Sequence, residues 1–178
     1  MNENSVILRT NITKLFRKYC TRCTGICCCC CMEFTVFDWE LRRLPIAENE
    51  LSFRKQWGRN DISNNKKIRR ITIGKKCLFA GNYECGLEIH IRPLDCISYP
   101  VYPMMQYSRN HRKAVIGLLV HKSCPYWQEI SLNKVLLHQI KEFWTIELQK
   151  IQKNDIKAWF GHKRNYWLDK NVIKIIDS

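Results

Sequence analysis

The sequence lacks any apolar run long enough to cross a membrane. A spanning helix needs about 18 or more consecutive apolar residues, and no such run occurs among the 178 residues. The first residues, Met1 to Arg9, also lack the basic segment and following apolar segment of a secretory signal. We therefore expect a cytoplasmic protein without a membrane span.

Recognisable catalytic patterns are also missing. The sequence contains no Gly-rich phosphate-binding loop, no pair of carboxylates in a catalytic setting and no Ser–His–Asp arrangement. These absences leave open whether the chain is an enzyme, but they favour a binding protein.

Acidic residues are scarce. The chain has 16 Asp and Glu against 30 Lys and Arg, which gives a formal net charge of +14. This surplus is compatible with nucleic acid, an acidic protein or an anionic surface as partner, and equally with a basic protein that has no such partner. The basic residues in 66–70 and 75–76 can contact phosphate, although a solvated face is the more common explanation for such a run.

Cysteine, in contrast, is abundant. Eleven residues are Cys, and seven of them lie between Cys20 and Cys31. A chain of this length with 46% hydrophobic residues can bury a core without disulfide staples, and an odd number of thiols cannot pair completely. Because clustered cysteines in a reducing compartment indicate metal or redox chemistry, we expect zinc or an iron–sulfur cluster.

The spacing of the cysteines suggests more than one metal. Cys20 and Cys23 form a Cys-x2-Cys turn that suits a single ion. The adjacent Cys27 and Cys28 point in different directions in a regular backbone, so they suit two ions or different irons of one cluster. The rest of the row, 29–31, is more simply explained as surplus thiols.

A second group of cysteines follows later in the chain. Structural zinc sites and iron–sulfur cubanes commonly take four ligands, so eight cysteines can fill two sites. His90 and His121 lie near cysteines and can complete a Cys3His site, although a polar or packed histidine is more common. The predicted metal ligands are Cys20, Cys23, Cys27, Cys28, Cys77, Cys85, Cys96 and Cys124.

Hydrophobic periodicity predicts an α+β fold: a small, irregular, metal-stapled domain with a few short strands and a C-terminal helical segment. The segments are an N-terminal helical part (1–19), a cysteine-cluster metal-binding domain (20–130) and C-terminal helices packed on it (131–178). The expected strands lie at 34–37, 68–73 and 114–121, and the expected helices at 38–44, at 132–151 and from 156 onward.

Two cysteine-containing stretches resemble a known family. The first is Cys20 to Cys28, which leads to a short strand and an acidic helix start; the second comprises Cys77, Cys85, Arg92-Pro93-Leu94-Asp95-Cys96 and Tyr99-Pro100. Together they are similar to the YkgJ-like, or CxxCxxCC, family of zinc- or iron-chelating domains. The resemblance covers about residues 20–125 and implies metal chelation by the cysteines of both stretches.

The chain departs from the family pattern at several points. One additional residue separates Cys23 from Cys27, so Cys30 and Cys31 remain alternatives to Cys27 and Cys28 as ligands. The Arg that usually follows the last cysteine of the second stretch is replaced by Ile in this chain.

Arg92 is a candidate cofactor-binding residue. A guanidinium beside anionic sulfurs offsets their charge and donates hydrogen bonds to them, and Pro93 would hold the turn that brings Cys96 back towards Cys85. A surface Arg on a turn is the simpler alternative.

Three functions are compatible with these residues. The first is a metal-chelating protein that binds zinc or an iron–sulfur cluster through two separated groups of cysteines. The second is a basic, zinc-stapled module that binds nucleic acid or a ribonucleoprotein. The third is an iron–sulfur-dependent redox or methyl-transfer enzyme. The cysteine pattern favours the first.

Overall fold

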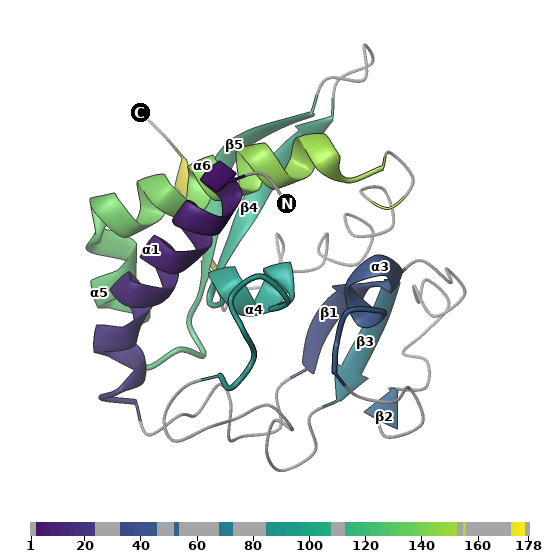
Figure 1. Ribbon diagram of the computed structural model, residues 1–178. Coiled ribbons are helices and arrows are strands. Elements are labelled where there is room, and N and C mark those ends of the chain that lie inside the picture. The colour runs from purple at the N-terminus through teal and green to yellow at the C-terminus, as the bar shows by residue number, and fades with distance from the viewer. Residues whose placement is uncertain are drawn as a thin grey trace.

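Two three-stranded antiparallel sheets and two long helices dominate the structure, which confirms the expected α+β class (Figure 1). The structure is a computed structural model. It describes residues 3–23, 33–45, 52–53, 68–72, 85–107, 113–152, 155 and 172–176.

The smaller sheet contains three short strands in the order β1-β3-β2. β1 (Glu33–Phe37) pairs antiparallel with β3 (Ile68–Thr72), with Phe37 opposite Ile68, and β2 (Ser52–Phe53) adds to the other edge of β3. The strands predicted at 34–37 and 68–73 are thus confirmed. The helix predicted after the first strand forms as α3 (Asp38–Leu41), shorter than expected.

The larger sheet has the order β4-β5-β6. Its central strand β5 (Lys113–His121) confirms the strand predicted at 114–121. β4 (Val101–Tyr107) carries Pro103, and proline is tolerated there because β4 is an edge strand whose outer N–H groups need no partner.

The last strand corrects the sequence-based prediction of helices throughout 131–178. β6 (Val172–Ile176) pairs antiparallel with β5, with Val172 opposite His121. Its sequence Val-Ile-Lys-Ile-Ile is almost entirely β-branched, which favours a strand once β5 offers an edge to pair with. The helix expected from 156 onward lies outside the described residues.

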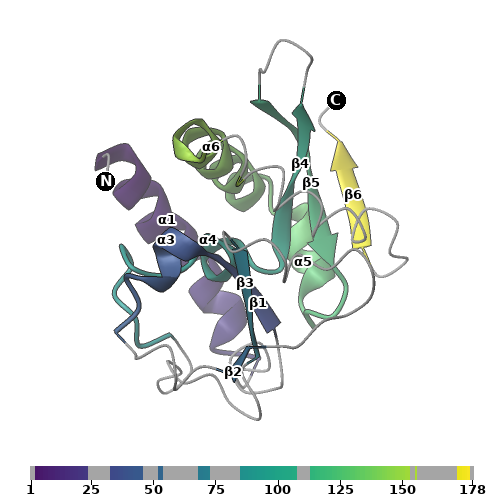
Figure 2. The same cartoon turned by 90° about the vertical axis from the view of Figure 1, so that its right-hand side faces the viewer.

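One of the two long helices covers a face of the larger sheet, and the other packs beside that helix. α6 (Lys134–Lys150) packs on β4 and β5, and α1 (Glu3–Cys20) lies antiparallel beside α6 (Figure 2). Both helices were predicted from their periodicity, although α1 extends further and includes Cys20. Two short helices, α4 (Leu94–Ser98) and α5 (Trp127–Leu132), were not predicted.

The main core lies between α1, α6 and the larger sheet. Burying one large apolar side chain contributes about 1.5 to 3 kcal/mol, so this layer fixes how α1 sits against the rest of the fold. The fully buried residues here include Ile12 of α1, Val101 and Val120 of the sheet, and Leu136, Ile140, Phe143 and Trp144 of α6.

Candidate metal centre

Five of the eight predicted cysteine ligands lie within the described residues. Cys20 ends α1, Cys23 lies in the turn that follows, and Cys124 lies in the turn between β5 and α5. Cys85 precedes the loop that leads to α4, and Cys96 is on α4. The other three, Cys27, Cys28 and Cys77, lie outside the described residues, as do 29–31 and the basic residues 66–67 and 75–76.

Three of these thiols occupy one neighbourhood. Cys23 and Cys124 are buried, whereas the Cys20 residue retains exposed surface. Burial of its thiol is the main cause that raises the pKa of Cys20 to about 11; the neighbouring thiols of Cys124 and Cys23 raise it further, and Arg92 opposes the rise. The sequence groups Cys124 with the second set of cysteines, but the structure places it beside the first.

A set of aromatic and polar contacts holds these thiols together. The Tyr126 hydroxyl donates to the backbone carbonyl of Arg22 at 3.1 Å, across 104 sequence positions. The Arg22 guanidinium lies 4.6 Å from the centre of the Tyr126 ring and forms an ion pair with Glu129 at 3.1 Å. The turn after α1 is therefore clamped onto the segment that begins at Cys124.

The N-cap of α6 belongs to the same clamp. The Asn133 Oδ1 atom accepts a hydrogen bond from the backbone N–H of Leu136 at 3.1 Å, and Asn133 Nδ2 donates to the Tyr19 hydroxyl at 3.0 Å. One side chain thus caps α6 and attaches it to the end of α1 that carries Cys20.

Replacing Asn133 with alanine is expected to lower the free energy of unfolding by about 1 to 2 kcal/mol, because both hydrogen bonds are lost. Urea unfolding monitored by circular dichroism measures this change. Asn133→Asp, which keeps the capping oxygen, should recover the capping part only. A change below about 0.3 kcal/mol in the alanine variant would show that the cap is unimportant.

Arg92 organises the loop that carries the second group of cysteines. Its Nε atom donates to the Leu87 carbonyl and its Nη2 atom to the Cys85 carbonyl, both at 2.8 Å. Its charge also acts on the thiol of Cys20. Arg92 is half-buried and is thus a loop-bracing residue within electrostatic range of the first group. These contacts distinguish Arg92 from an ordinary surface arginine on a turn.

Pro93 immediately precedes α4. The backbone N–H of Cys96 donates to the Pro93 carbonyl at 3.0 Å and so starts the helix. Most of α4 is buried, whereas Cys96 is exposed on its outer side.

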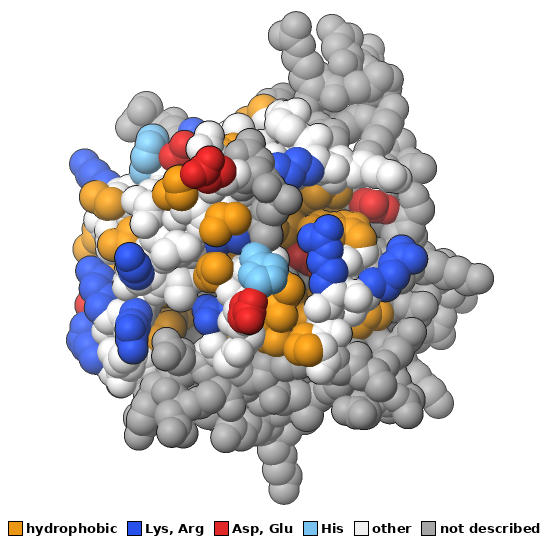
Figure 3. Space-filling view, in the orientation of Figure 1, with side chains coloured by type: hydrophobic (Ala, Val, Ile, Leu, Met, Phe, Trp, Pro, Cys, Tyr) orange, Lys and Arg blue, Asp and Glu red, His pale blue; other side chains and the backbone are white. Residues whose placement is uncertain are grey.

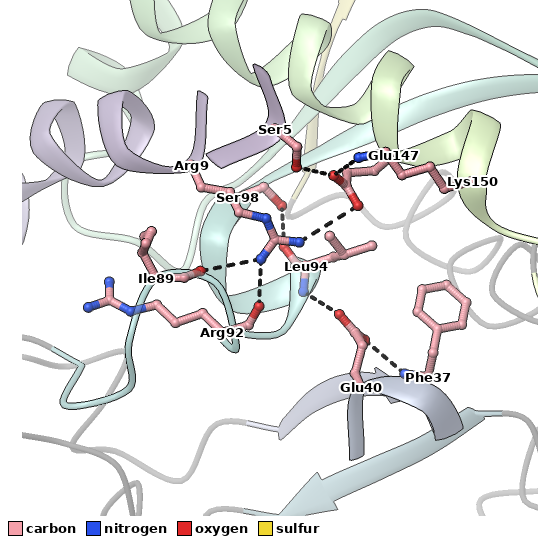
Figure 4. Close-up of polar contacts among 10 residues, drawn as sticks. All are labelled: Ser5, Arg9, Phe37, Glu40, Ile89, Arg92, Leu94, Ser98, Glu147 and Lys150. Atoms are coloured by element: carbon pink, nitrogen blue, oxygen red, sulfur yellow. Dashed lines mark hydrogen bonds and ion pairs between the residues drawn. The ribbon is translucent and has the colours of Figure 1, made fainter. Parts of the chain in front are cut away.

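Arg9 is the most important polar residue near this region that sequence reasoning missed. It projects from α1, only 3% exposed, and its Nη1 atom donates to the carbonyls of Arg92 at 2.9 Å and Ile89 at 3.4 Å (Figure 4). Its Nη2 atom lies 3.7 Å from the Glu147 carboxylate, and its guanidinium lies 5.3 Å from the centre of the Phe143 ring. Arg9 therefore fixes the 89–92 loop against α1 and α6.

Glu147 and Glu40 complete this buried polar network. Glu147 accepts hydrogen bonds from Ser5 and from Lys150 as well as the charge of Arg9. Glu40 of α3 accepts from the backbone N–H of Phe37 at 2.9 Å and of Leu94 at 2.7 Å, so it joins the smaller sheet to α4 (Figure 4).

A signal for this network is present in the sequence. Ser5 and Arg9 share a helical face with Ile12 and Phe16, and a polar pair at those positions of an apolar face must find partners in the interior. The positions do not reveal which partners those are.

The donor chemistry fits a soft metal only in part. Cys20, Cys23 and Cys124 offer sulfur ligands of the type that zinc and iron–sulfur clusters take. Within the residues that the structure describes, however, no group of three or more His, Cys, Asp or Glu is close enough to hold a metal ion. A fourth ligand, and shorter distances between the thiols, would have to be supplied by cysteines 27–31 or by Cys77.

The two candidate histidines have other contacts. His90 is half exposed and its Nδ1 atom lies 3.3 Å from Glu88. His121 accepts a hydrogen bond at Nδ1 from the backbone N–H of Ser123, at 3.1 Å. These contacts support the ordinary polar role that the sequence favours for both.

No protein-family model, curated protein or solved structure matches this chain. Among the described helices, none has the length and apolar character needed to span a membrane.

Proposed function

We propose that this protein is a metal-chelating cysteine-cluster protein that holds zinc or an iron–sulfur cluster, in line with its resemblance to the YkgJ-like family. The observation that carries the proposal is the clamp between Arg22, Tyr126 and Glu129. It brings Cys20 and Cys23 together with Cys124, although about one hundred residues separate them in the chain.

Ordinary core packing does not require thiols at these positions. Three cysteines gathered beside one arginine are readily explained as ligands, because the arginine offsets the negative charge of bound thiolates. We assign Cys20, Cys23 and Cys124 to one site, with either Cys27 or Cys28 as its fourth ligand. Cys77, Cys85 and Cys96 supply the second site together with the other of these two adjacent cysteines, and Arg92 acts on both Cys20 and the Cys85 carbonyl.

When bound, a metal would supply a link between the end of α1 and the turn before α5. Cys23 and Cys124 are suited to this because they are buried and attached to separate elements. The contribution of the chain is to keep the thiols close and to exclude water from two of them.

Metal and labile-sulfide analysis of protein purified without oxygen tests this function. We expect at least one equivalent of metal per chain; sulfide and a brown colour would identify an iron–sulfur cluster, and their absence together with bound zinc would identify a zinc site. Cys23→Ser and Cys124→Ser should each reduce the bound metal by half or more, because a closed four-ligand site tolerates the loss of a thiolate poorly.

A matched control is Cys29→Ser, which removes a thiol that we regard as surplus and should leave the metal content unchanged. Protein that carries neither metal nor sulfide at stoichiometric levels would refute the proposed function. Equal loss of metal in all three variants would refute the ligand assignment.

A further inference from the structure

A second site is suggested by a cavity on the opposite side of the Arg9 network from the cysteines. It has a volume of about 350 Å³ and lies where α1, α3 and the C-terminal end of α6 meet. Figure 3 shows the hollow right of centre, with Lys and Arg side chains around its opening. Cavities of about 300 to 1,000 Å³ are typical of small-molecule sites.

Three basic side chains from three different elements line this cavity: Arg9 from α1, Arg43 from the turn after α3, and Lys150 from the end of α6. Burial lowers the pKa of Arg9, the carboxylates of Glu147 and Glu40 oppose this, and the positive charge of Arg43 lowers it again. Arg9 and Arg43 are thus close enough to repel each other, and an anion near Arg43 would relieve this repulsion.

The two carboxylates of the lining, Glu147 and Asp155, do not balance these three charges. Glu147 is already shared between Ser5, Arg9 and Lys150. Lys150 uses one of its three N–H donors on Glu147 at 2.9 Å. Asp155 can accept a hydrogen bond from a hydroxyl or amine of a bound molecule.

An apolar wall accompanies the charges. Trp39 and Ile151 both line the cavity. One side of Trp39 stacks on Phe37, with ring centres 5.6 Å apart, and the Arg43 guanidinium lies 5.2 Å from the centre of the Trp39 ring. Trp39 therefore holds Arg43 at the cavity and adds apolar surface to the lining.

We propose that this cavity binds a small organic anion, a carboxylate or a phosphate monoester with a short apolar body. Its anionic group lies between Arg43 and Lys150, and its apolar body contacts Trp39 and Ile151. This site is independent of metal binding, since none of its lining residues is a predicted metal ligand.

Isothermal titration calorimetry of the full chain with benzoate, phenyl phosphate, inorganic phosphate and benzyl alcohol tests the proposal. We expect saturable one-to-one binding of benzoate or phenyl phosphate, and binding of inorganic phosphate and of the neutral alcohol that is at least about tenfold weaker. Arg43→Ala and Lys150→Ala should each weaken binding at least about tenfold, because each removes a charged hydrogen bond.

Arg42→Ala and Lys134→Ala are matched controls, because these exposed cations lie next to Arg43 and at the other end of α6 but do not line the cavity. They should change the affinity less than about twofold. The proposal is overturned if neither organic anion shows saturable binding, if the alcohol or inorganic phosphate binds as tightly, or if the control and cavity variants weaken binding equally. Unchanged near-ultraviolet circular dichroism shows that each variant is folded.

Discussion

Replacing Arg9 with methionine is expected to lower the free energy of unfolding by about 3 kcal/mol. Removing one member of a buried ion pair costs about 3 to 5 kcal/mol, because the other charge is left uncompensated. Lys150 remains on Glu147 at 2.9 Å and moderates that loss. The carbonyls of Ile89 and Arg92 also lose their donor, which adds to the cost. Urea unfolding gives the change directly.

The control for this variant is Lys14→Met, on the same helix but exposed, which should change the free energy by less than about 0.5 kcal/mol. A double variant, Arg9→Met with Glu147→Leu, should be more stable than Arg9→Met alone, because it also removes the buried Glu147 carboxylate that has lost its arginine partner. If Arg9→Met costs less than about 1 kcal/mol, the buried network is not a main support of the fold.

The second large effect is a loss of stability with rising pH that depends on Glu40. Burial raises the pKa of Glu40 from its ordinary 4.5 to about 7; Asp95 adds to the rise, while the hydrogen bonds from Phe37 and Leu94 and the charge of Arg9 oppose it. Between these two values the folded protein keeps a proton that the unfolded chain releases. The free energy of unfolding therefore falls as the pH rises through this window.

At about 1.4 kcal/mol for each pH unit, the loss due to Glu40 reaches about 3 kcal/mol above pH 7. It is measured as the difference in unfolding free energy between the wild type and Glu40→Gln at pH 5 and at pH 8. This comparison cancels the other titrating groups and any constant effect of the amide. As a control, the difference in unfolding free energy between the wild type and Glu142→Gln, which changes an exposed carboxylate of α6, should be the same at pH 5 and at pH 8. A difference between wild type and Glu40→Gln that is the same at both pH values would contradict the expectation.

Local sequence pattern was a good guide to the regular elements with strong periodicity. The apolar repeat of α6 and the continuous apolar run of β5 identify both elements. A helix such as α6 has to present one apolar face to the core, whereas a central strand such as β5 is apolar on both faces. Shorter elements carried weaker signals. Neither α4, with five residues, nor the proline-containing β4 has a pattern of its own. β6 was misassigned because the helical periodicity of 132–151 was taken to continue to the end of the chain.

The candidate metal centre was likewise predicted only in part. Clustered thiols and the Arg-Pro step are visible in the sequence, and so is their chemistry. Sequence order put Cys124 with the later cysteines, whereas the clamp between Tyr126 and Arg22 puts it beside Cys20 and Cys23. Spacing along the chain cannot show this, since the contact joins residues 104 positions apart.

The sequence by itself determined the α+β class and the main helices and strands, and it contains the cysteine pattern on which the proposed metal site rests, because these depend on residue type and short-range spacing. Only the tertiary structure decided which thiols lie together, and that Arg9 joins α1 to the 89–92 loop and to Glu147. A buried charge must be matched by partners from whichever segments the core brings beside it. Those partners are a property of the packing and leave little trace in the local sequence.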